Sequence, residues 1–282
     1  MNIRTLCLDV DAFRDTGRVF PEDIEKDGWV VFHGTCEANA KSIEQHGFRP
    51  TAVPVSSDDV EAVLTVFEQM KWEGADPAGL TILRAFARGD FDGEARSPVF
   101  FADNAAGALL YATREYAGGE KLRGLRIAIR DLQRYLGDEE VRAQHQADVV
   151  RDILWLKERY GSDAVPVEWR PPSVDLEWLG MSVRALEGLS TRAVEWYERH
   201  GGGVVYAVRF TEQDVVQLGL KGGQGGLRTR AKVPPEHIVS KVSVPAQFVI
   251  DDVASIHSVE RLQKGGGLFQ AIQRAHSGVR RV

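Results

Sequence analysis

The sequence predicts an α+β fold in which one β-rich core carries large helical insertions. Short β-type runs are concentrated near residues 29–49, 97–112 and 203–250, and long helical patterns fill the intervals between them. No internal repeat or low-complexity tract is visible, which argues against a solenoid or an array. A chain of 282 residues, 43% of them hydrophobic, is long enough to bury such a core.

The expected strands are short apolar runs bounded by glycine, proline or charged residues. They comprise residues 29–32, 99–101, 204–210, 238–244 and 247–250. The expected helices carry apolar side chains about one turn apart. They comprise residues 57–72, which open with a cap-like Ser57-Asp58-Asp59, residues 138–160, and residues 183–200, which end at Gly201-Gly202-Gly203.

These elements predict a single domain over residues 1–264. Its core blocks are residues 29–50, 97–116 and 202–250, and its mainly helical insertions are residues 55–95 and 117–200. Residues 265–282 begin with three glycines and are rich in arginine, so we expect a short basic tail there.

Charge and hydropathy narrow the classes of function. The formal net charge of −6 argues against a protein whose whole surface binds a polyanion, although Arg228, Arg230 and Lys232 form a local basic cluster. No apolar run approaches the roughly 18 residues of a membrane span, and the first residues carry acids where a signal peptide is basic and then apolar. We therefore expect a cytoplasmic protein without membrane association.

The chain has two cysteines, Cys7 and Cys36, which are too few for a disulfide framework. Neither has histidine or cysteine partners at metal-ligand spacing, so we expect reduced thiols and no metal. Cys36 lies within the first motif described below, but no base is spaced to activate it as a nucleophile.

The first motif that suggests chemistry is VVFHGTCEANAKSIEQHGFRP, residues 30–50. A strand ends in His33-Gly34-Thr35, a short helix follows, and Gly47-Phe48-Arg49 closes the segment. A histidine followed by glycine and a small hydroxyl residue offers a side-chain donor and exposed backbone amides at one point. Such a point suits a planar carboxamide and a sugar. The alternative is a partly buried His33 that is satisfied by the backbone.

The second motif runs from Pro98 to Tyr111, PVFFADNAAGALLY. Its pattern predicts a strand, a helix cap at the Asp-Asn pair, and a helix of small residues. Phe100 and Tyr111 provide aromatic faces that could orient a flat ring and exclude water. Side chains alternate across a strand, so at least one of Phe100 and Phe101 must belong to the core.

The third motif lies in residues 202–244, where a strand, a glycine-rich loop and the phrase Val-Pro-Pro-Glu-His-Ile lead into another strand. Together, and in this order, the three blocks resemble ADP-ribosyltransferases of the His-Tyr-Glu class, the group of the poly(ADP-ribose) polymerases and diphtheria-toxin-like enzymes. In that class His-Gly-Ser/Thr and a later Gly-Leu/Phe-Arg recur, followed by a Tyr-Phe-Ala-Asp block. The resemblance implies a split antiparallel β-sheet core.

The resemblance also implies a role for each matching residue. His33 would bond the adenosine ribose of NAD⁺, the Gly34 backbone would hold the nicotinamide carboxamide, and Thr35 would support the pocket. Arg49 would reach the adenosine or diphosphate portion. Tyr111 would stack on nicotinamide.

Two positions depart from the family pattern. Phe100 stands where the triad tyrosine is expected, and a phenyl ring can still orient nicotinamide. Gln224 stands where the catalytic glutamate is expected; it keeps a hydrogen bond but supplies no negative charge and no base. Either the acceptor needs no base, or another carboxylate such as Glu212 or Glu236 acts, or the enzyme is weak or inactive.

The function implied by the resemblance is NAD⁺-dependent mono-ADP-ribosylation of RNA, DNA or protein by a toxin or phage-defence effector, with an antitoxin as a plausible partner. Three alternatives stay open: a catalytically impaired NAD-binding interaction module, an NAD glycohydrolase, and an RNA 2′-phosphotransferase. The phosphotransferases share His-Gly-Thr and Val-Pro-Pro-Glu phrases. However, Val99-Phe100-Phe101-Ala102-Asp103 replaces their His-Val-His-Leu-Ser-like strand.

Overall fold

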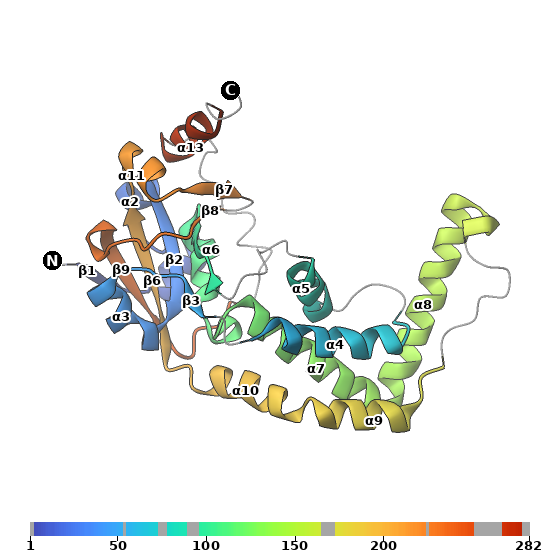
Figure 1. Ribbon diagram of the computed structural model, residues 1–282. Coiled ribbons are helices and arrows are strands. Elements are labelled where there is room, and N and C mark those ends of the chain that lie inside the picture. The colour runs from blue at the N-terminus through green and yellow to red at the C-terminus, as the bar shows by residue number, and fades with distance from the viewer. Residues whose placement is uncertain are drawn as a thin grey trace. The chain divides into compact units, whose positions relative to one another are not determined.

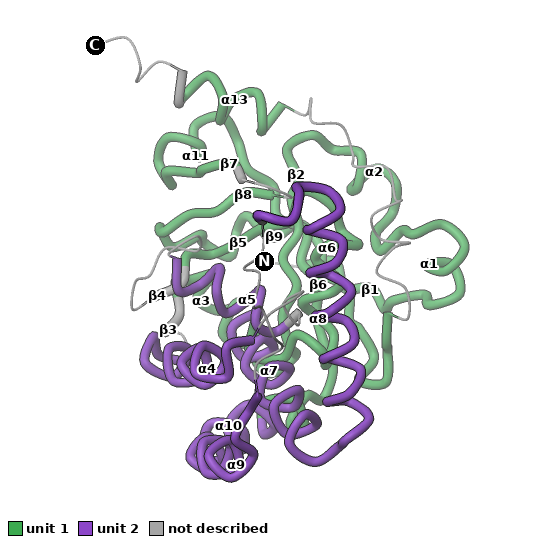
Figure 2. Tube along the Cα trace, turned by 90° about the vertical axis from the view of Figure 1, so that its right-hand side faces the viewer, with its two compact units in different colours: residues 1–53, 94–119, 196–282 green, residues 54–93, 120–195 purple. Residues whose placement is uncertain are grey.

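The computed structural model shows an α+β protein with a mixed seven-stranded sheet (Figure 1). The residues that it describes are 3–52, 55–72, 78–88, 96–164, 173–223, 226–250 and 267–277. The chain forms two compact units, coloured separately in Figure 2. Unit 1 comprises residues 1–53, 94–119 and 196–282, and unit 2 comprises residues 54–93 and 120–195. The expectation that residues 1–264 act as one catalytic domain stays a prediction.

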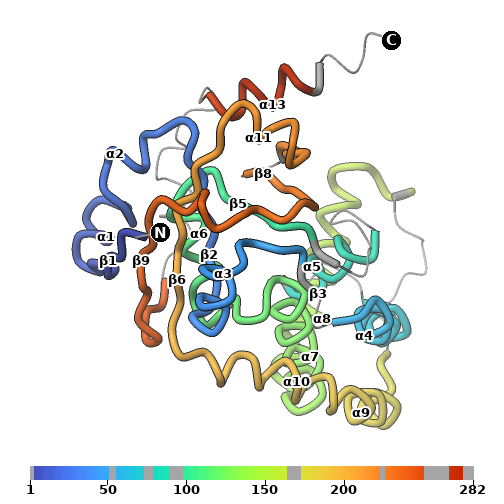
Figure 3. Tube along the Cα trace, turned by 60° about the vertical axis from the view of Figure 1, so that its left-hand side comes forward, coloured from blue at the N-terminus to red at the C-terminus, as the bar shows by residue number. Residues whose placement is uncertain are grey.

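The sheet belongs to unit 1, and its central strands can be followed in Figure 3. Its strands, in spatial order, are β1 (Arg4–Cys7), β9 (Ile238–Pro245), β6 (Gly202–Arg209), β2 (Val30–Cys36), β5 (Val99–Ala102), β8 (Gly226–Thr229) and β7 (Lys221–Gly223). All neighbours are antiparallel except β1 and β9, which run parallel. The expected antiparallel sheet is therefore wrong at that edge, where β1 is not joined to β9 by a hairpin. A second, two-stranded ladder pairs β3 (Thr51–Ala52) with β4 (Arg96–Ser97).

Helices cover both faces of this sheet, because its strands alternate apolar side chains toward each. One face packs against α3 (Ala40–His46), α11 (Glu212–Gln217) and α13 (Gly267–Ser277). The other packs against α1 (Val10–Thr16), α2 (Glu22–Glu25) and α6 (Ala105–Tyr111). Within the stretch expected to be a basic tail, α13 buries Leu268, Ala271 and Ile272 in the first of these cores.

The sheet is weakly joined at its centre. β2 and β6 pair along seven residues, from Val30 to Cys36, whereas β2 and β5 share the single register pair Phe32–Ala102. The two strands therefore diverge beyond this pair. Short 3-10 turns complete the connections of unit 1: η1 (Glu37–Asn39), η2 (Arg114–Tyr116) and η4 (Pro235–His237).

The described regular elements of unit 2 are helical. They are α4 (Ser57–Gln69), α5 (Ala78–Ala87), α7 (Glu120–Gly137), α8 (Glu139–Tyr160), η3 (Ser162–Ala164), α9 (Leu176–Ala185) and α10 (Glu187–Glu198), the last of which runs on into unit 1. A capping box between Ser56 and Asp59 starts α4. α5 approaches α7 closely, because a Cβ on Gly79 would lie 2.6 Å from the amide nitrogen of Ala128.

Several expected elements are confirmed with small shifts of their bounds, and two are wrong. The helix expected over residues 183–200 is divided between α9 and α10, because the chain turns at Leu186, whose amide donates to Val183 O at 3.1 Å. The strand expected over residues 247–250 is absent. There the chain turns after Pro245, whose carbonyl accepts from the Phe248 amide at 3.0 Å.

Candidate functional site

His33 lies on β2 and connects it to β5 at the point where the two strands diverge. Its Nδ1 lies 2.8 Å from the carbonyl oxygen of Phe100. Because a carbonyl only accepts, Nδ1 carries the proton and Nε2 presents a lone pair. Burial lowers the pKa of His33, and the bond to Phe100 opposes this only in part. The ring is therefore neutral at pH 7 and can accept a hydrogen bond through Nε2.

Aromatic side chains hold this ring in place. The ring centroid of Phe48 lies 4.9 Å from that of His33, edge on, and the Phe101 centroid lies 5.7 Å away. Phe48 is fixed in turn by reciprocal backbone bonds to Val233. Gly47 permits this approach, because its φ is +76° and a Cβ there would lie 2.1 Å from the Val233 oxygen. The Gly-Phe-Arg phrase thus positions the first motif's histidine.

Gly34 is the point at which α6 packs directly onto β2. A Cβ at Gly34 would lie 1.8 Å from the carbonyl oxygen of Ala108, so any side chain would push the helix away. α6 starts at Asn104, whose side chain accepts from the Gly107 amide at 2.6 Å. This packing fixes where Tyr111, at the end of α6, presents its ring.

Phe100 and Tyr111 are large aromatic residues that the fold leaves open to solvent, with 43% and 39% of their surface exposed. On the same strand, Phe101 is 2% exposed and belongs to the core. Strand alternation therefore places Phe100 on the α6 side of the sheet. The Tyr111 ring lies 5.1 Å from that of Tyr116, between centroids. Each of these exposed rings, one near the start and one at the end of the second motif, can contact a flat, apolar ligand group.

Thr35 and Cys36 share one neighbour, Asn39. The Nδ2 group of Asn39 donates to the Thr35 hydroxyl at 2.9 Å and to the Cys36 sulfur at 3.3 Å. Burial raises the pKa of the Cys36 thiol, so the thiol is protonated at neutral pH. Both side chains therefore shape the end of β2, and Cys36 is not an activated nucleophile.

A polar cluster that the sequence analysis did not single out lies beside His33. Tyr206, the register partner of His33 on β6, donates its hydroxyl to Glu44 on α3 at 3.1 Å. Lys241 on β9 donates to the same carboxylate at 2.7 Å. Burial and the Glu44 charge raise the pKa of Tyr206, so its hydroxyl stays protonated. A lysine in the middle of a strand whose alternate residues are buried was the signal that could have revealed this cluster.

The other described residues that the sequence singled out are not in contact with His33 in any interaction that the structure gives. Arg49 is exposed just after Phe48, and Glu236 is exposed in η4. Glu212 forms an exposed ion pair with Arg274 at 2.9 Å. Gln224 lies outside the described residues, between the last residue of β7 and the start of β8. The first residue of β8, Gly226, pairs with Ala102 of β5.

Phe100 also belongs to a row of side chains that crosses the edge of the sheet. Its register partner on β8 is Arg228, and the partner of Arg228 on β7 is Lys221. Register partners share a face, so the exposed ring lies beside two cationic side chains. This row favours an anionic group next to an aromatic one.

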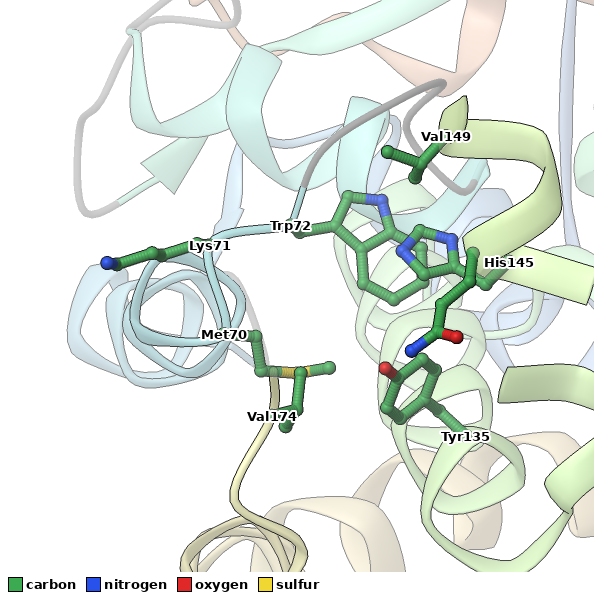
Figure 4. A pocket seen from close by; sticks show the side chains of 8 residues that line it. Met70, Lys71, Trp72, Tyr135, His145, Val149 and Val174 are labelled. Atoms are coloured by element: carbon green, nitrogen blue, oxygen red, sulfur yellow. The ribbon is translucent and has the colours of Figure 1, made fainter. Parts of the chain in front are cut away.

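Unit 2 contains a small cavity of about 10 Å³, room for roughly one water molecule, shown in Figure 4. The rings of Trp72 and His145 are stacked beside it with centroids 3.9 Å apart, and Tyr135 meets His145 edge on. A cavity of this size holds no organic ligand. Within the described ranges, no group of three or more His, Cys, Asp or Glu side chains could hold a metal ion.

Comparison with known proteins finds no matching family model, no matching curated protein and no matching solved structure. The fold and the side chains themselves define an α+β protein whose divided sheet carries a neutral histidine and exposed aromatic rings. In the part of the chain that the structure describes, no helix is both long and apolar enough to cross a membrane.

Proposed function

We propose that this protein is an NAD⁺-dependent mono-ADP-ribosyltransferase that modifies a macromolecule inside the cell. The observation that carries the proposal is the bond between His33 and the Phe100 carbonyl at the divergence of β2 and β5. It joins the first and second motifs of the His-Tyr-Glu resemblance in space. It also leaves a neutral Nε2 that can accept from a ribose hydroxyl.

Three further features support binding of NAD⁺ in this region. The exposed rings of Phe100 and Tyr111 suit nicotinamide, which is flat and becomes the leaving group. Arg228 and Lys221 lie in register beside Phe100 and suit the diphosphate. The single register pair between β2 and β5 agrees with the split sheet that the resemblance implies.

In the proposed reaction the bond between C1′ of the ribose and the nicotinamide nitrogen breaks, and its electron pair leaves with nicotinamide. The ribose then has oxocarbenium character, and an oxygen or nitrogen of the acceptor attacks C1′ and loses its proton. The protein contributes mainly orientation and exclusion of water around the leaving ring. Gln224 would hold the ribose by a hydrogen bond, without the negative charge of a glutamate.

Two carboxylates considered as substitutes are poorly suited by their surroundings. Glu212 is engaged by Arg274 in an exposed ion pair. Glu236 is exposed on η4, which contacts α3. We therefore propose that the acceptor carries a strong nucleophile or that transfer is slow. A toxin or defence role would fit a slow, single modification.

The test uses NAD⁺ labelled in its adenine, incubated with the purified chain and a bacterial lysate, followed by separate nuclease and protease treatment. We expect transferred label with wild type and with His46→Ala, an exposed-histidine control, and loss of label with His33→Ala. Sensitivity to nuclease identifies a nucleic-acid acceptor, and sensitivity to protease identifies a protein. Equal transfer by wild type and His33→Ala, or none by either, contradicts the proposal.

The same assay separates the alternatives. Stoichiometric free ADP-ribose without any acceptor points to an NAD glycohydrolase. Saturable NAD⁺ binding, measured by calorimetry, without nicotinamide release points to an interaction module that has lost catalysis. Removal of a 2′-phosphate from RNA in the presence of NAD⁺ points to a phosphotransferase.

A further inference from the structure

Helix α8 packs one face against the other helices of unit 2. The described residues leave its opposite face uncovered. On the inner side, Val149 is 2% exposed, His145 stacks on Trp72, and the Arg142 guanidinium donates to Tyr135 O at 2.9 Å. α7, by comparison, buries apolar side chains along most of its length. The second half of α8 extends past α7 in Figure 1.

The outer face of α8 carries an apolar seam. It consists of Ala143, Ala147, Val150 and Leu154, all exposed, and their spacing of four, three and four residues keeps them on one side of a helix. Val150 is 38% exposed and Leu154 is 60% exposed. Trp155, beside the seam, is 51% exposed. Exposed leucine and tryptophan side chains along one helix face are typical of a protein contact surface.

We propose that this seam is the contact through which two copies of the chain pair, with their α8 helices antiparallel around a two-fold axis near Val150. In that arrangement Leu154 of each copy packs over the small Ala143 and Ala147 of the other. Large side chains then meet small ones on either side of the central pair of Val150 residues, which allows close packing of the two helices.

The charges of α8 favour this orientation. Its first turn carries Glu139 and Glu140, and its last turn carries Lys157 and Arg159, with Glu158 between them. Antiparallel overlap brings the acidic end of one helix to the basic end of the other, whereas parallel overlap would bring like charges together. The opposed helix dipoles favour the same choice.

The same surface of each copy forms both halves of the contact. A two-fold axis therefore relates the two copies, and the assembly is a closed dimer. Overlap of two 22-residue helices, each about 33 Å long, gives a small interface. We therefore expect a dimer that dissociates on dilution through the micromolar range.

Sedimentation velocity of the full chain over a concentration series tests the proposal. We expect a shift from 31.3 kDa toward twice that mass as concentration rises. Leu154→Glu should weaken self-association by about 30-fold or more, as loss of a central interface residue does. Val216→Glu, which charges a 74% exposed valine on α11, should leave it unchanged. The proposal is overturned if the wild-type chain is a monomer at every concentration, or if Leu154→Glu leaves the dissociation constant of the dimer unchanged.

Disulfide trapping tests the antiparallel orientation separately. With Cys7 and Cys36 replaced by serine, Val150→Cys lies near its own counterpart and should cross-link readily on oxidation. Leu154→Cys should not, because antiparallel symmetry separates the two copies of this position by about 12 Å along the helices. Equal cross-linking at both positions indicates a parallel pair and overturns the orientation. Charge reversal gives an independent readout: Glu140→Lys should weaken the dimer, and adding Arg159→Glu should restore it.

Discussion

At the scale of single residues, the protonation of His33 decides what the site can bind. A neutral ring with Nδ1–H donated to Phe100 O offers one acceptor, and a protonated ring offers none. Burial lowers the His33 pKa, which keeps the acceptor available through neutral pH. The same burial moves protonation of Nε2, and with it the loss of any complex that uses this acceptor, to a more acid pH.

His33→Ala should weaken NAD⁺ binding by about 10- to 100-fold, the cost of one hydrogen bond in a partly buried site. Wild-type affinity should be constant above pH 7 and should fall as pH drops through the lowered pKa of His33, because Nε2 then carries a proton. Calorimetric titration with NAD⁺ between pH 5 and 8 measures both effects. His46→Ala should follow the wild-type profile; a profile of His33→Ala with the same acid loss would exclude His33 as the titrating group.

Gln224→Glu should increase the rate of nicotinamide release by about ten- to a hundredfold, because a carboxylate stabilises the cationic ribose and can act as a base. NAD⁺ affinity should change little. Stopped assays of nicotinamide measure the rate, with Gln213→Glu, an exposed glutamine on α11, as the matched control. An unchanged rate in Gln224→Glu would show that position 224 does not face the reacting ribose.

At the scale of elements, close packing of α6 on β2 sets the geometry of the site. The helix can approach because Gly34 has no side chain and because α6 is built from small residues. The polar cluster of Tyr206, Glu44 and Lys241 secures α3 on the opposite face. Both faces of β2 are therefore fixed next to His33.

Gly34→Ala should destabilise the protein by about 3 kcal/mol or more, because the new Cβ must displace the Ala108 carbonyl by overpacking a strand–helix contact. Gly188→Ala, in α10 where a Cβ meets no atom within 4 Å, should be neutral or stabilise by about 1 kcal/mol. Thermal unfolding of the two variants gives the comparison. Equal stability of Gly34→Ala and wild type would contradict the close approach of α6.

The elements also show what could be predicted from the sequence. The core strands and the helices α4 and α8 follow from periodicity and caps, and each changes only at its ends. Sequence patterns did not predict the turn at Leu186, the parallel pairing of β1 with β9, or the β7–β8 ladder. Tertiary pairing decides these features: β1 finds β9 across almost the whole chain, and a glycine-rich stretch has little strand propensity of its own.

The same limit applies to the site. His33, Gly34, Phe100 and Tyr111 could be singled out because short motifs carry them, and the structure brings His33 and Phe100 together. Tyr206 and Glu44 could not, since a strand tyrosine and a helix glutamate are ordinary residues until their register is known. Short sequence patterns indicate only local geometry. The cluster of Tyr206, Glu44 and Lys241 is built from segments far apart in the chain, so no such pattern predicts it.

At the scale of the whole molecule, three partly buried histidines couple stability to pH. Burial is the main cause that lowers the pKa of His33 and His200 in unit 1 and of His145 in unit 2. Arg114 lowers that of His200 further, while Glu37 opposes the shift; Asp148 opposes that of His145. The folded chain therefore binds these protons less readily than the unfolded chain does.

The sign of the effect follows from this difference. Stability should be constant above the unfolded histidine pKa of about 6.5 and should fall as pH drops below it toward the folded values. Denaturant unfolding at pH 7.5, 6.5 and 5.5 measures the free energy. His145→Phe keeps the stacked ring but does not titrate, so its stability should decline less; a decline as steep as that of wild type would show that His145 contributes nothing.

The division of unit 1 into three segments has a consequence for biosynthesis. β2 leaves the ribosome early, but β6, with which it pairs along its whole length, is translated only after both segments of unit 2. At ordinary elongation rates this delay is on the order of ten seconds. Throughout it, the edge of β2 that pairs with β6 has no partner, so the nascent polypeptide exposes an unpaired strand edge until translation is nearly finished.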